Sequence, residues 1–287
     1  MLRWLLVALF SIAAASRTAT AKPFAPTAFG VDVRGAGRPV ILIPGLGCPA
    51  SVWDEVATHL VATGHEVHVL AIAGFAGRAA IEGDVGAAVR ADLVAYIRDR
   101  GLDHPVVVGH SLGGFLAFWL AASEPALVGP TVIVDAAPYM FSEADPKDVA
   151  ANAARWRGFT DAQFATAIAE YFGAMANDRK RMDPIIAAVA HSDRRAFIDA
   201  FVEMSRVDVR AKLAATTVPV LAILAEGQAF AAKVAGQMAP IKDRTIVALP
   251  NTRHFVFFDD PIGFDRELDK FLVAHPAAAR RGMLAAP

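Results

Sequence analysis

Cysteine is almost absent from this sequence, because Cys48 is the only one among 287 residues. A single cysteine excludes an intrachain disulfide and any metal site built from several thiolates. Cys48 lies between glycine and proline in a predicted loop, which favours a small unreactive side chain. There are eight histidines, but no pair has the H-E-x-x-H spacing of a helical zinc site. We therefore expect no catalytic metal.

An excess of charge of one sign is also lacking. The formal net charge is -1 and the pI is about 6.7, and basic and acidic residues are interspersed rather than grouped. Binding to nucleic acid or to an anionic membrane surface needs a strongly basic face, so neither partner is expected. With 55% hydrophobic residues, a chain of this length can bury one large core.

Long hydrophobic runs are rare, and the clearest one lies at the start of the chain. One positive charge precedes an apolar segment over residues 4–15, and A-T-A at 19–21 forms a small-x-small site. These features are typical of a secretory signal peptide over residues 1–21. The run is short for a membrane-spanning helix, which needs about twenty apolar residues. We expect the mature chain, 22–287, to be secreted or periplasmic, with no stable membrane association.

Strand and helix patterns alternate along most of the chain. Short apolar or β-branched runs predict strands, and amphipathic segments between them predict helices. The expected strands cover 30–34, 40–43, 66–71, 105–108, 131–134, 218–224 and 245–249, and the expected helices 52–61, 84–98, 112–122, 229–238 and 261–273. Repeated strand and helix units predict an α/β fold with a doubly wound, mostly parallel sheet and helices on both faces.

The alternation stops in the middle of the chain. About residues 139–205 show no convincing strand pattern, and Phe164, Ile168 and Phe172 have helical spacing. We expect this stretch to form a helical cap inserted into one domain, because the sheet pattern resumes after it. About residues 275–287 are rich in alanine and arginine, which predicts a disordered tail.

A serine flanked by glycines lies between one expected strand and the helix after it. Gly109-His110-Ser111-Leu112-Gly113 fits the G-x-S-x-G pattern, in which the glycines allow a sharp turn where a Cβ would clash. The turn holds the serine in a strained conformation and projects its hydroxyl outward. Ser111 is therefore the candidate nucleophile, and we assign the neighbouring His110 to packing or orientation.

This serine turn resembles the nucleophile elbow of the α/β-hydrolase superfamily, and the resemblance extends over about residues 30–273. It implies the α/β-hydrolase fold with a helical cap, in an enzyme of the serine esterase or lipase type. A serine nucleophile needs a base, and histidine takes and returns a proton near neutral pH. His254, in a loop after the last expected strand, resembles the histidine of the superfamily.

The third member of the triad should be a buried carboxylate that orients the histidine. Relatives usually place an aspartate in a Gly-x-x-Asp turn after the strand that here ends at 224. This chain has A-E-G-Q at 225–228, and the glutamine cannot carry the charge. Two substitutes are in view: Asp135, at the end of the strand after the elbow unit, and Glu226, two residues before the usual position. We favour Asp135.

Two backbone N–H groups complete the expected site, because the developing negative charge needs fixed donors. Leu112, at the start of the elbow helix, supplies one. I-P-G-L-G at 43–47 resembles the superfamily's oxyanion loop, with proline in place of histidine, and makes Leu46 the second donor. The same loop lacks the third glycine of a dinucleotide motif and the Gly-Lys-Ser/Thr of a P-loop. We expect no cofactor.

Together these residues predict a serine hydrolase that cleaves a carboxylic ester through an acyl-enzyme on Ser111. The expected substrate is a small apolar ester or lactone, because the cap is apolar and the chain is expected to be exported. Lactones and amides pass through similar intermediates, so a lactonase or amidase is open. A non-catalytic protein of the same fold that binds a small apolar ligand is the alternative from another class.

Overall fold

Seven strands form one sheet in the part of the chain that the computed structural model describes, residues 24–140 and 146–277. The predicted signal peptide and most of the predicted tail lie outside these ranges. The strands are β1 (Phe29–Gly35), β2 (Arg38–Ile43), β3 (His65–Ile72), β4 (Val106–His110), β5 (Thr131–Val134), β6 (Val220–Leu224) and β7 (Arg244–Ala248).

The strand order in the sheet is β1-β3-β2-β4-β5-β6-β7. All neighbouring strands are parallel except β1, which runs antiparallel to β3 and does not pair with β2, its neighbour in sequence. The central strands β4, β5 and β6 are buried along their whole length, as expected where helices cover both faces of a parallel sheet. The predicted doubly wound, mostly parallel sheet is confirmed.

Helices follow the strands close to where the sequence predicts them. Each expected helix is present with ends shifted by at most two residues, and the short helix α9 was not expected. The helices are α1 (Asp54–Ala62), α2 (Val85–Arg100), α3 (Leu112–Ser123), α8 (Gln228–Gln237), α9 (Val256–Asp259) and α10 (Pro261–Ala274), with the 3-10 helices η1 (Ala50–Trp53) and η2 (Arg210–Ala215).

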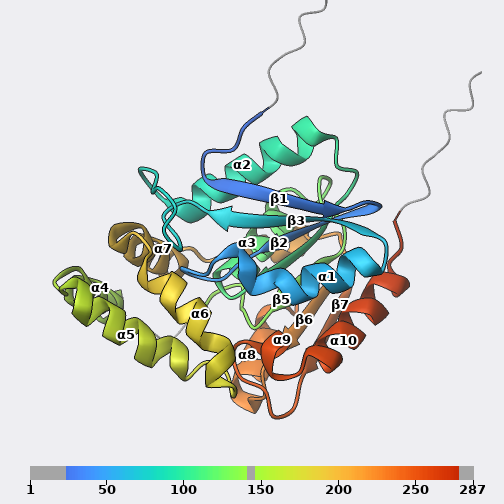
Figure 1. Ribbon diagram of the computed structural model, residues 1–287. Coiled ribbons are helices and arrows are strands. Elements are labelled where there is room, and N and C mark those ends of the chain that lie inside the picture. Colours follow the sequence, from blue (N-terminus) through green and yellow to red (C-terminus); the bar gives the residue numbers. More distant parts are fainter. Residues whose placement is uncertain (1–23, 141–145, 278–287) are drawn as a thin grey trace, which may run out of the picture.

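Strand β4 shows which helices cover which face of the sheet, because adjacent strand residues point to opposite faces. A Cβ on Gly109 would lie 2.1 Å from the carbonyl oxygen of Gly113 in α3. The next residue, His110, packs against Trp53 of η1 and Phe257 of α9. Helix α3 therefore covers one face, with α2 packed against it, while η1 and α9 cover the other (Figure 1).

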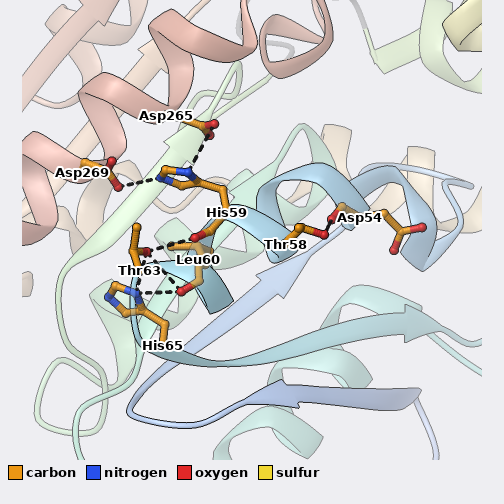
Figure 2. A network of polar contacts seen from close by, with 8 residues as sticks. All are labelled: Asp54, Thr58, His59, Leu60, Thr63, His65, Asp265 and Asp269. Atoms are coloured by element: carbon orange, nitrogen blue, oxygen red, sulfur yellow. Dashed lines mark hydrogen bonds and ion pairs between the residues drawn. The ribbon is translucent and has the colours of Figure 1, made fainter.

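A polar network ties α10 to α1 (Figure 2). Nε2 of His59 lies 2.9 Å from Oδ1 of Asp269, and Nδ1 lies 3.7 Å from Oδ2 of Asp265. The two aspartates are four residues apart and so share one face of α10. Both acidic side chains are partly exposed to solvent. The network therefore joins α10 to α1 at the surface of the molecule.

In the described part of the chain, four α-helices lie between β5 and η2, and we call them the cap. They are α4 (Pro146–Arg157), α5 (Asp161–Gly173), α6 (Arg179–Ala190) and α7 (Arg194–Arg206). Figure 1 shows them grouped at one side of the sheet, in yellow-green to gold. Phe164, Ile168 and Phe172 of α5 are buried, so the helical spacing read from the sequence marks the packed face of that helix.

The cap is fastened to the rest of the molecule by a buried carboxylate. Glu203 of α7 is 2% exposed, and its two oxygens accept hydrogen bonds from the N–H groups of Gly86 and Ala87, at 2.7 and 2.8 Å. These N–H groups belong to the first turn of α2 and have no acceptor within that helix. A side chain of the cap thus accepts the free N–H groups at the start of α2. We call the sheet and the helices outside the cap the sheet domain.

Candidate active site

The candidate site lies where the parallel strands end, and each strand contributes through the turn or loop that follows it. The Gly45–Leu46 turn follows β2, Ser111 follows β4, Asp135 follows β5 and His254 follows β7. Because the carboxyl ends of parallel strands share one edge of the sheet, residues far apart in the sequence meet there.

Ser111 occupies the turn between β4 and α3. Its φ of 54° and ψ of -116° lie outside the regions that non-glycine residues favour, so the surrounding structure must hold this strained conformation. A Cβ on Gly113 would lie 2.1 Å from the carbonyl oxygen of Ile43, which leaves room only for glycine. The sharp turn predicted from the G-x-S-x-G pattern is therefore present.

His254 lies in the loop between β7 and α9, and its Nδ1 is 2.6 Å from Oδ2 of Asp135. A carboxylate accepts hydrogen bonds, so Nδ1 carries the ring proton and donates it to Asp135. The second ring nitrogen, Nε2, is then unprotonated in the neutral imidazole. This is the tautomer in which a histidine can accept a proton from a neighbouring hydroxyl.

Asp135 is held at the end of β5 by contacts on both carboxylate oxygens. Oδ2 bonds to His254, while Oδ1 accepts the N–H of Ala225 at 2.9 Å. Its side chain is mostly buried, and its φ is 44°, a second strained position beside the serine turn. Ala225 follows β6, so the strand end that usually carries the acid in relatives here orients an acid on the neighbouring strand.

The structure places the alternative acid, Glu226, away from the imidazole ring. Its Oε2 accepts the N–H of Asn251 at 2.7 Å, and Asn251 has a φ of 56°. Glu226 therefore supports the loop that carries His254 through the backbone, and its longer side chain does not reach the ring as the alternative required. Gln228, in the usual acid position, is the first residue of α8.

The turn that contains Leu46 packs directly against the serine. A Cβ on Gly45 would lie 3.3 Å from the Cβ of Ser111. Leu112 is the first residue of α3, so its N–H has no acceptor within that helix. Within the described ranges, neither the N–H of Leu46 nor that of Leu112 donates to a backbone carbonyl oxygen in a turn, in a loop or at a helix end. Both N–H groups are thus available for the oxyanion role, which stays a prediction.

His110 holds the loop that carries His254. Its Nε2 donates to the carbonyl oxygen of His254 at 2.9 Å, and its buried Nδ1 has no hydrogen-bond partner among the residues described. Burial and the neighbouring His254 hold the pKa of His110 well below its usual range, so the ring is neutral. The sequence indicated packing or orientation but gave no sign of which residue His110 orients, because the two lie 144 positions apart.

A cavity of about 310 Å³ is lined by both Ser111 and His254. Most of its other walls are apolar. Tyr171, Phe172, Met175, Phe201 and Met204 come from the cap, and Leu46, Met140 and Phe255 come from outside it. The methionine side chains are flexible and adapt to differently shaped ligands. Among the described residues, no aspartate, glutamate, lysine or arginine lines this cavity, so these walls suit an uncharged apolar group. The individual cap residues at its wall were not predicted.

Residues 40–266 match the sequence profile of the alpha/beta hydrolase family. The chain belongs to the α/β-hydrolase family. This α/β-hydrolase is 29% identical over 259 residues to RutD of Variovorax paradoxus (strain S110), a candidate carbamate hydrolase, covering 86% of this chain and 96% of the relative. It is 24% identical over 261 residues to the pimeloyl-[acyl-carrier protein] methyl ester esterase of Aliivibrio salmonicida (strain LFI1238), covering 84% and 94% of the two chains.

Solved structures share the fold of this α/β-hydrolase at lower identity. The enol-lactonase from Burkholderia xenovorans LB400 superimposes with a TM-score of 0.73 and 17% identity, covering 85% of this chain and 96% of that one. A thermophilic esterase from Thermogutta terrifontis gives a TM-score of 0.76 with 20% identity, covering 86% and 94%. The family match supports a hydrolase, and these structures show the fold.

Other histidines of this α/β-hydrolase lie in structural contacts. His68 bonds to Tyr96 and Glu66, and the exposed His191 of the cap does not line the cavity.

Within 24–140 and 146–277, no group of three or more His, Cys, Asp or Glu residues could hold a metal ion. No helix of these ranges is long and apolar enough to cross a bilayer. Burial raises the pKa of Cys48, at the cavity wall, to about 12.

Proposed function

We propose that this α/β-hydrolase is a serine hydrolase that cleaves apolar carboxylic esters through an acyl-enzyme on Ser111. The observation that carries the proposal is the 2.6 Å contact between His254 and Asp135, beside the cavity that Ser111 also lines. Serine, acid and histidine follow one another in the chain order of this fold. The same contact argues against a non-catalytic binding protein, whose only support was the glutamine in the usual acid position.

In the proposed reaction, Nε2 of His254 accepts the proton of the Ser111 hydroxyl as Oγ attacks the ester carbonyl carbon. Asp135 holds the imidazole in the required tautomer and stabilises the imidazolium. The N–H groups of Leu46 and Leu112 bind the oxyanion. The bond to the alcohol then breaks, and the alcohol leaves with the proton from His254.

The second half of the reaction returns the enzyme to its starting state. His254 accepts a proton from water, whose oxygen attacks the acyl carbon. The bond between that carbon and Oγ of Ser111 breaks, and His254 returns the proton to Oγ. The carboxylic acid is released. No step requires a metal or a cofactor.

The walls of the cavity support an uncharged apolar substrate. The relatives are named for a carbamate, a methyl ester and an enol-lactone, and all three are attacked at a carbonyl carbon. A lactone is a cyclic ester, so lactonase activity on the same triad is the second candidate, favoured by the enol-lactonase likeness. Hydrolysis of ethyl butyrate, γ-butyrolactone and butyramide, which differ at the bond that breaks, separates ester, lactone and amide activity.

The decisive experiment is labelling with a fluorophosphonate probe. We expect one label on each wild-type molecule, none on Ser111→Ala, and labelling slowed by at least about a thousandfold in His254→Ala. Ser205→Ala is the matched control, because this serine is also buried but its hydroxyl donates to the carbonyl oxygen of Val202. A folded wild-type protein that takes no label would overturn the proposal.

We also propose that the chain is exported and that residues 1–21 are then removed. The support is the charged, apolar and small-residue pattern of the first residues. In a fusion of residues 1–30 to a reporter enzyme, the exported product should begin at Lys22. A product that stays in the cytoplasm and begins at Met1 would contradict export.

A further inference from the structure

A second cavity lies beside the first one, within the cap. Its volume is about 340 Å³, compared with about 310 Å³ for the cavity at Ser111. Its walls are mainly side chains of α4, α5 and α7: Trp156, Phe164, Ala167, Ile168 and Phe197. Tyr171 lines both cavities, so the two spaces adjoin at this side chain.

Tyr171 is positioned as a shared wall rather than as an ordinary surface residue. Its side chain is 49% exposed, and its ring stands edge-on to that of Phe172 at 5.7 Å. Burial nevertheless raises the pKa of its hydroxyl. The ring is therefore partly packed against protein, and part of its surface lines both cavities.

The size and the charge of the second cavity both fit an uncharged extension of a ligand. Ligand sites in proteins measure about 300–1,000 Å³, so each cavity alone is at the lower end of this range and the two together are well inside it. Among the described residues, the charged ones that line the second cavity are Arg155 and Glu170, which have opposite signs and are exposed. The remaining lining residues are aromatic and aliphatic.

We propose that the second cavity binds the distal part of the substrate. A medium-chain apolar arm extends from the ester carbonyl at Ser111, passes Tyr171 and ends against Trp156 and Phe197. Each methylene group that leaves water contributes to binding, so the arm favours octyl-sized over acetyl-sized substrates. This inference rests on the proposed function and names its substrate class, a neutral ester with one medium-length arm.

The kinetic test fills the second cavity and leaves the first one open. Ala167 lines only the second cavity and is partly buried, so Ala167→Phe should block it. Two pairs of substrates cover both possible arms: p-nitrophenyl acetate with p-nitrophenyl octanoate, and methyl acetate with octyl acetate. Ala162→Phe, an exposed position on the same helix, is the matched control.

We expect Ala167→Phe to lower kcat/KM for at least one of the two long substrates by about tenfold. The short substrates should change by less than about twofold, and Ala162→Phe should resemble the wild type. Retained activity on acetates also shows that the variant folds. Equal losses on short and long substrates, or no loss on either long substrate, would refute the inference.

A binding test keeps the inference separate from the catalytic proposal. Bromine quenches tryptophan fluorescence on contact, and Trp156 lines the second cavity while Trp53 and Trp119 line neither. In the Ser111→Ala background, ethyl ω-bromooctanoate or ω-bromooctyl acetate should quench the emission of Trp156. Adding Trp156→Phe or Ala167→Phe should abolish this quenching, and ethyl ω-bromobutyrate should produce none.

The two tests can fail independently. Quenching by a long ligand in a protein that hydrolyses no ester would refute the serine hydrolase and keep the second cavity as a binding site. Ester hydrolysis with no quenching by either long ligand would refute the cavity assignment and leave the catalytic proposal intact.

Discussion

The sheet domain and the cap are stabilised in different ways. Helices α1, α2 and α3 of the sheet domain have no side-chain hydrogen bond at their N-caps, whereas α5, α6 and α7 of the cap have N-caps provided by Thr160, Asp178 and Asp193. A side-chain cap typically contributes about 1 kcal/mol to a helix. The cap helices thus carry local stabilisation that α1, α2 and α3 lack, and α10, which packs beside the sheet, shares it through Asp260.

The two regions also differ in backbone strain, which is found beside the candidate site and not in the cap. Ser111, Asp135 and Asn251, around the candidate site, all have positive φ, while no non-glycine residue between 146 and 206 does. The cap packs partly through aromatic pairs, such as Trp156 with Phe201 at 5.0 Å between ring centroids. Under the proposed function, the strained sheet edge performs the chemistry and the side chains of the cap select the substrate.

The largest effect is expected when Asp135, the proposed acid at the sheet edge, loses its charge. We expect Asp135→Asn to lower kcat on p-nitrophenyl acetate by about four orders of magnitude, because an amide can stabilise the wrong imidazole tautomer. Glu226→Gln is the matched control and should stay within about threefold of the wild type, since Glu226 contacts only the backbone of the histidine loop. A larger loss in Glu226→Gln than in Asp135→Asn would reverse the assignment of the acid.

Replacing a glycine by alanine should lower the free energy of unfolding more beside the candidate site than in the cap. Gly113→Ala should lower the free energy of unfolding by about 4 kcal/mol, because its Cβ would lie 2.1 Å from a backbone oxygen. In the cap, the nearest atom to a Cβ on Gly158 is 3.5 Å away, so Gly158→Ala should change stability by less than about 1 kcal/mol. Urea unfolding measures both, and similar losses would contradict the difference.

Removing the contact of Glu203 in the cap with α2 of the sheet domain should have an intermediate effect on the free energy of unfolding. Glu203→Ala leaves two N–H groups of α2 without their buried acceptor, and we expect a loss of about 2–3 kcal/mol in urea unfolding. Glu170→Ala, an exposed glutamate of the cap, is the control and should change stability by less than about 0.5 kcal/mol. Equal effects would show that Glu203 does not fasten the cap.

Glu203 also predicts a pH dependence. Burial raises the pKa of Glu203, although the N–H groups of Gly86 and Ala87 oppose this shift. Between the unfolded pKa, about 4.3, and the higher folded pKa, the folded state holds the additional proton. The free energy of unfolding that Glu203 contributes therefore falls as pH rises through this window. Glu203→Gln should lack this fall, and an unchanged pH slope would refute it.

The smallest effect is expected at the surface of the sheet domain. The contacts of His59 with Asp265 and Asp269 involve partly exposed side chains (Figure 2), and such pairs contribute at most about 1 kcal/mol. His59→Gln should lower the free energy of unfolding by no more than this. A loss as large as that of Glu203→Ala would show that the α1–α10 contact matters as much as the fastening of the cap.

The sheet and the serine turn could be predicted because their signals are local. A buried strand is visible as a short apolar run, and the elbow as two glycines at fixed distances from Ser111. The pairing of β1 with β3 rather than with β2 was not visible, since nothing in the sequence of one strand specifies its partner. The four helices of the cap fall inside the stretch expected to be helical, but their individual ends were not predicted.

The acid could be narrowed to two residues but not decided from the sequence. Asp135 and Glu226 follow strands that are neighbours in the sheet, so both reach the same edge. The contact that favours Asp135 joins residues 119 positions apart, and it depends on the backbone of Ala225 and on the direction of each side chain. The cavity walls were hidden for the same reason, because the cap residues at both cavities meet only after folding.

Cys48 gives this enzyme a practical property for spectroscopy. It is the only thiol in the chain, it is buried, and its pKa of about 12 leaves roughly one molecule in 10⁵ as the reactive thiolate at neutral pH. An exposed cysteine introduced into the cap, such as Ala162→Cys, would therefore react with a maleimide dye far faster than Cys48. A single fluorophore can be attached without first replacing any native residue.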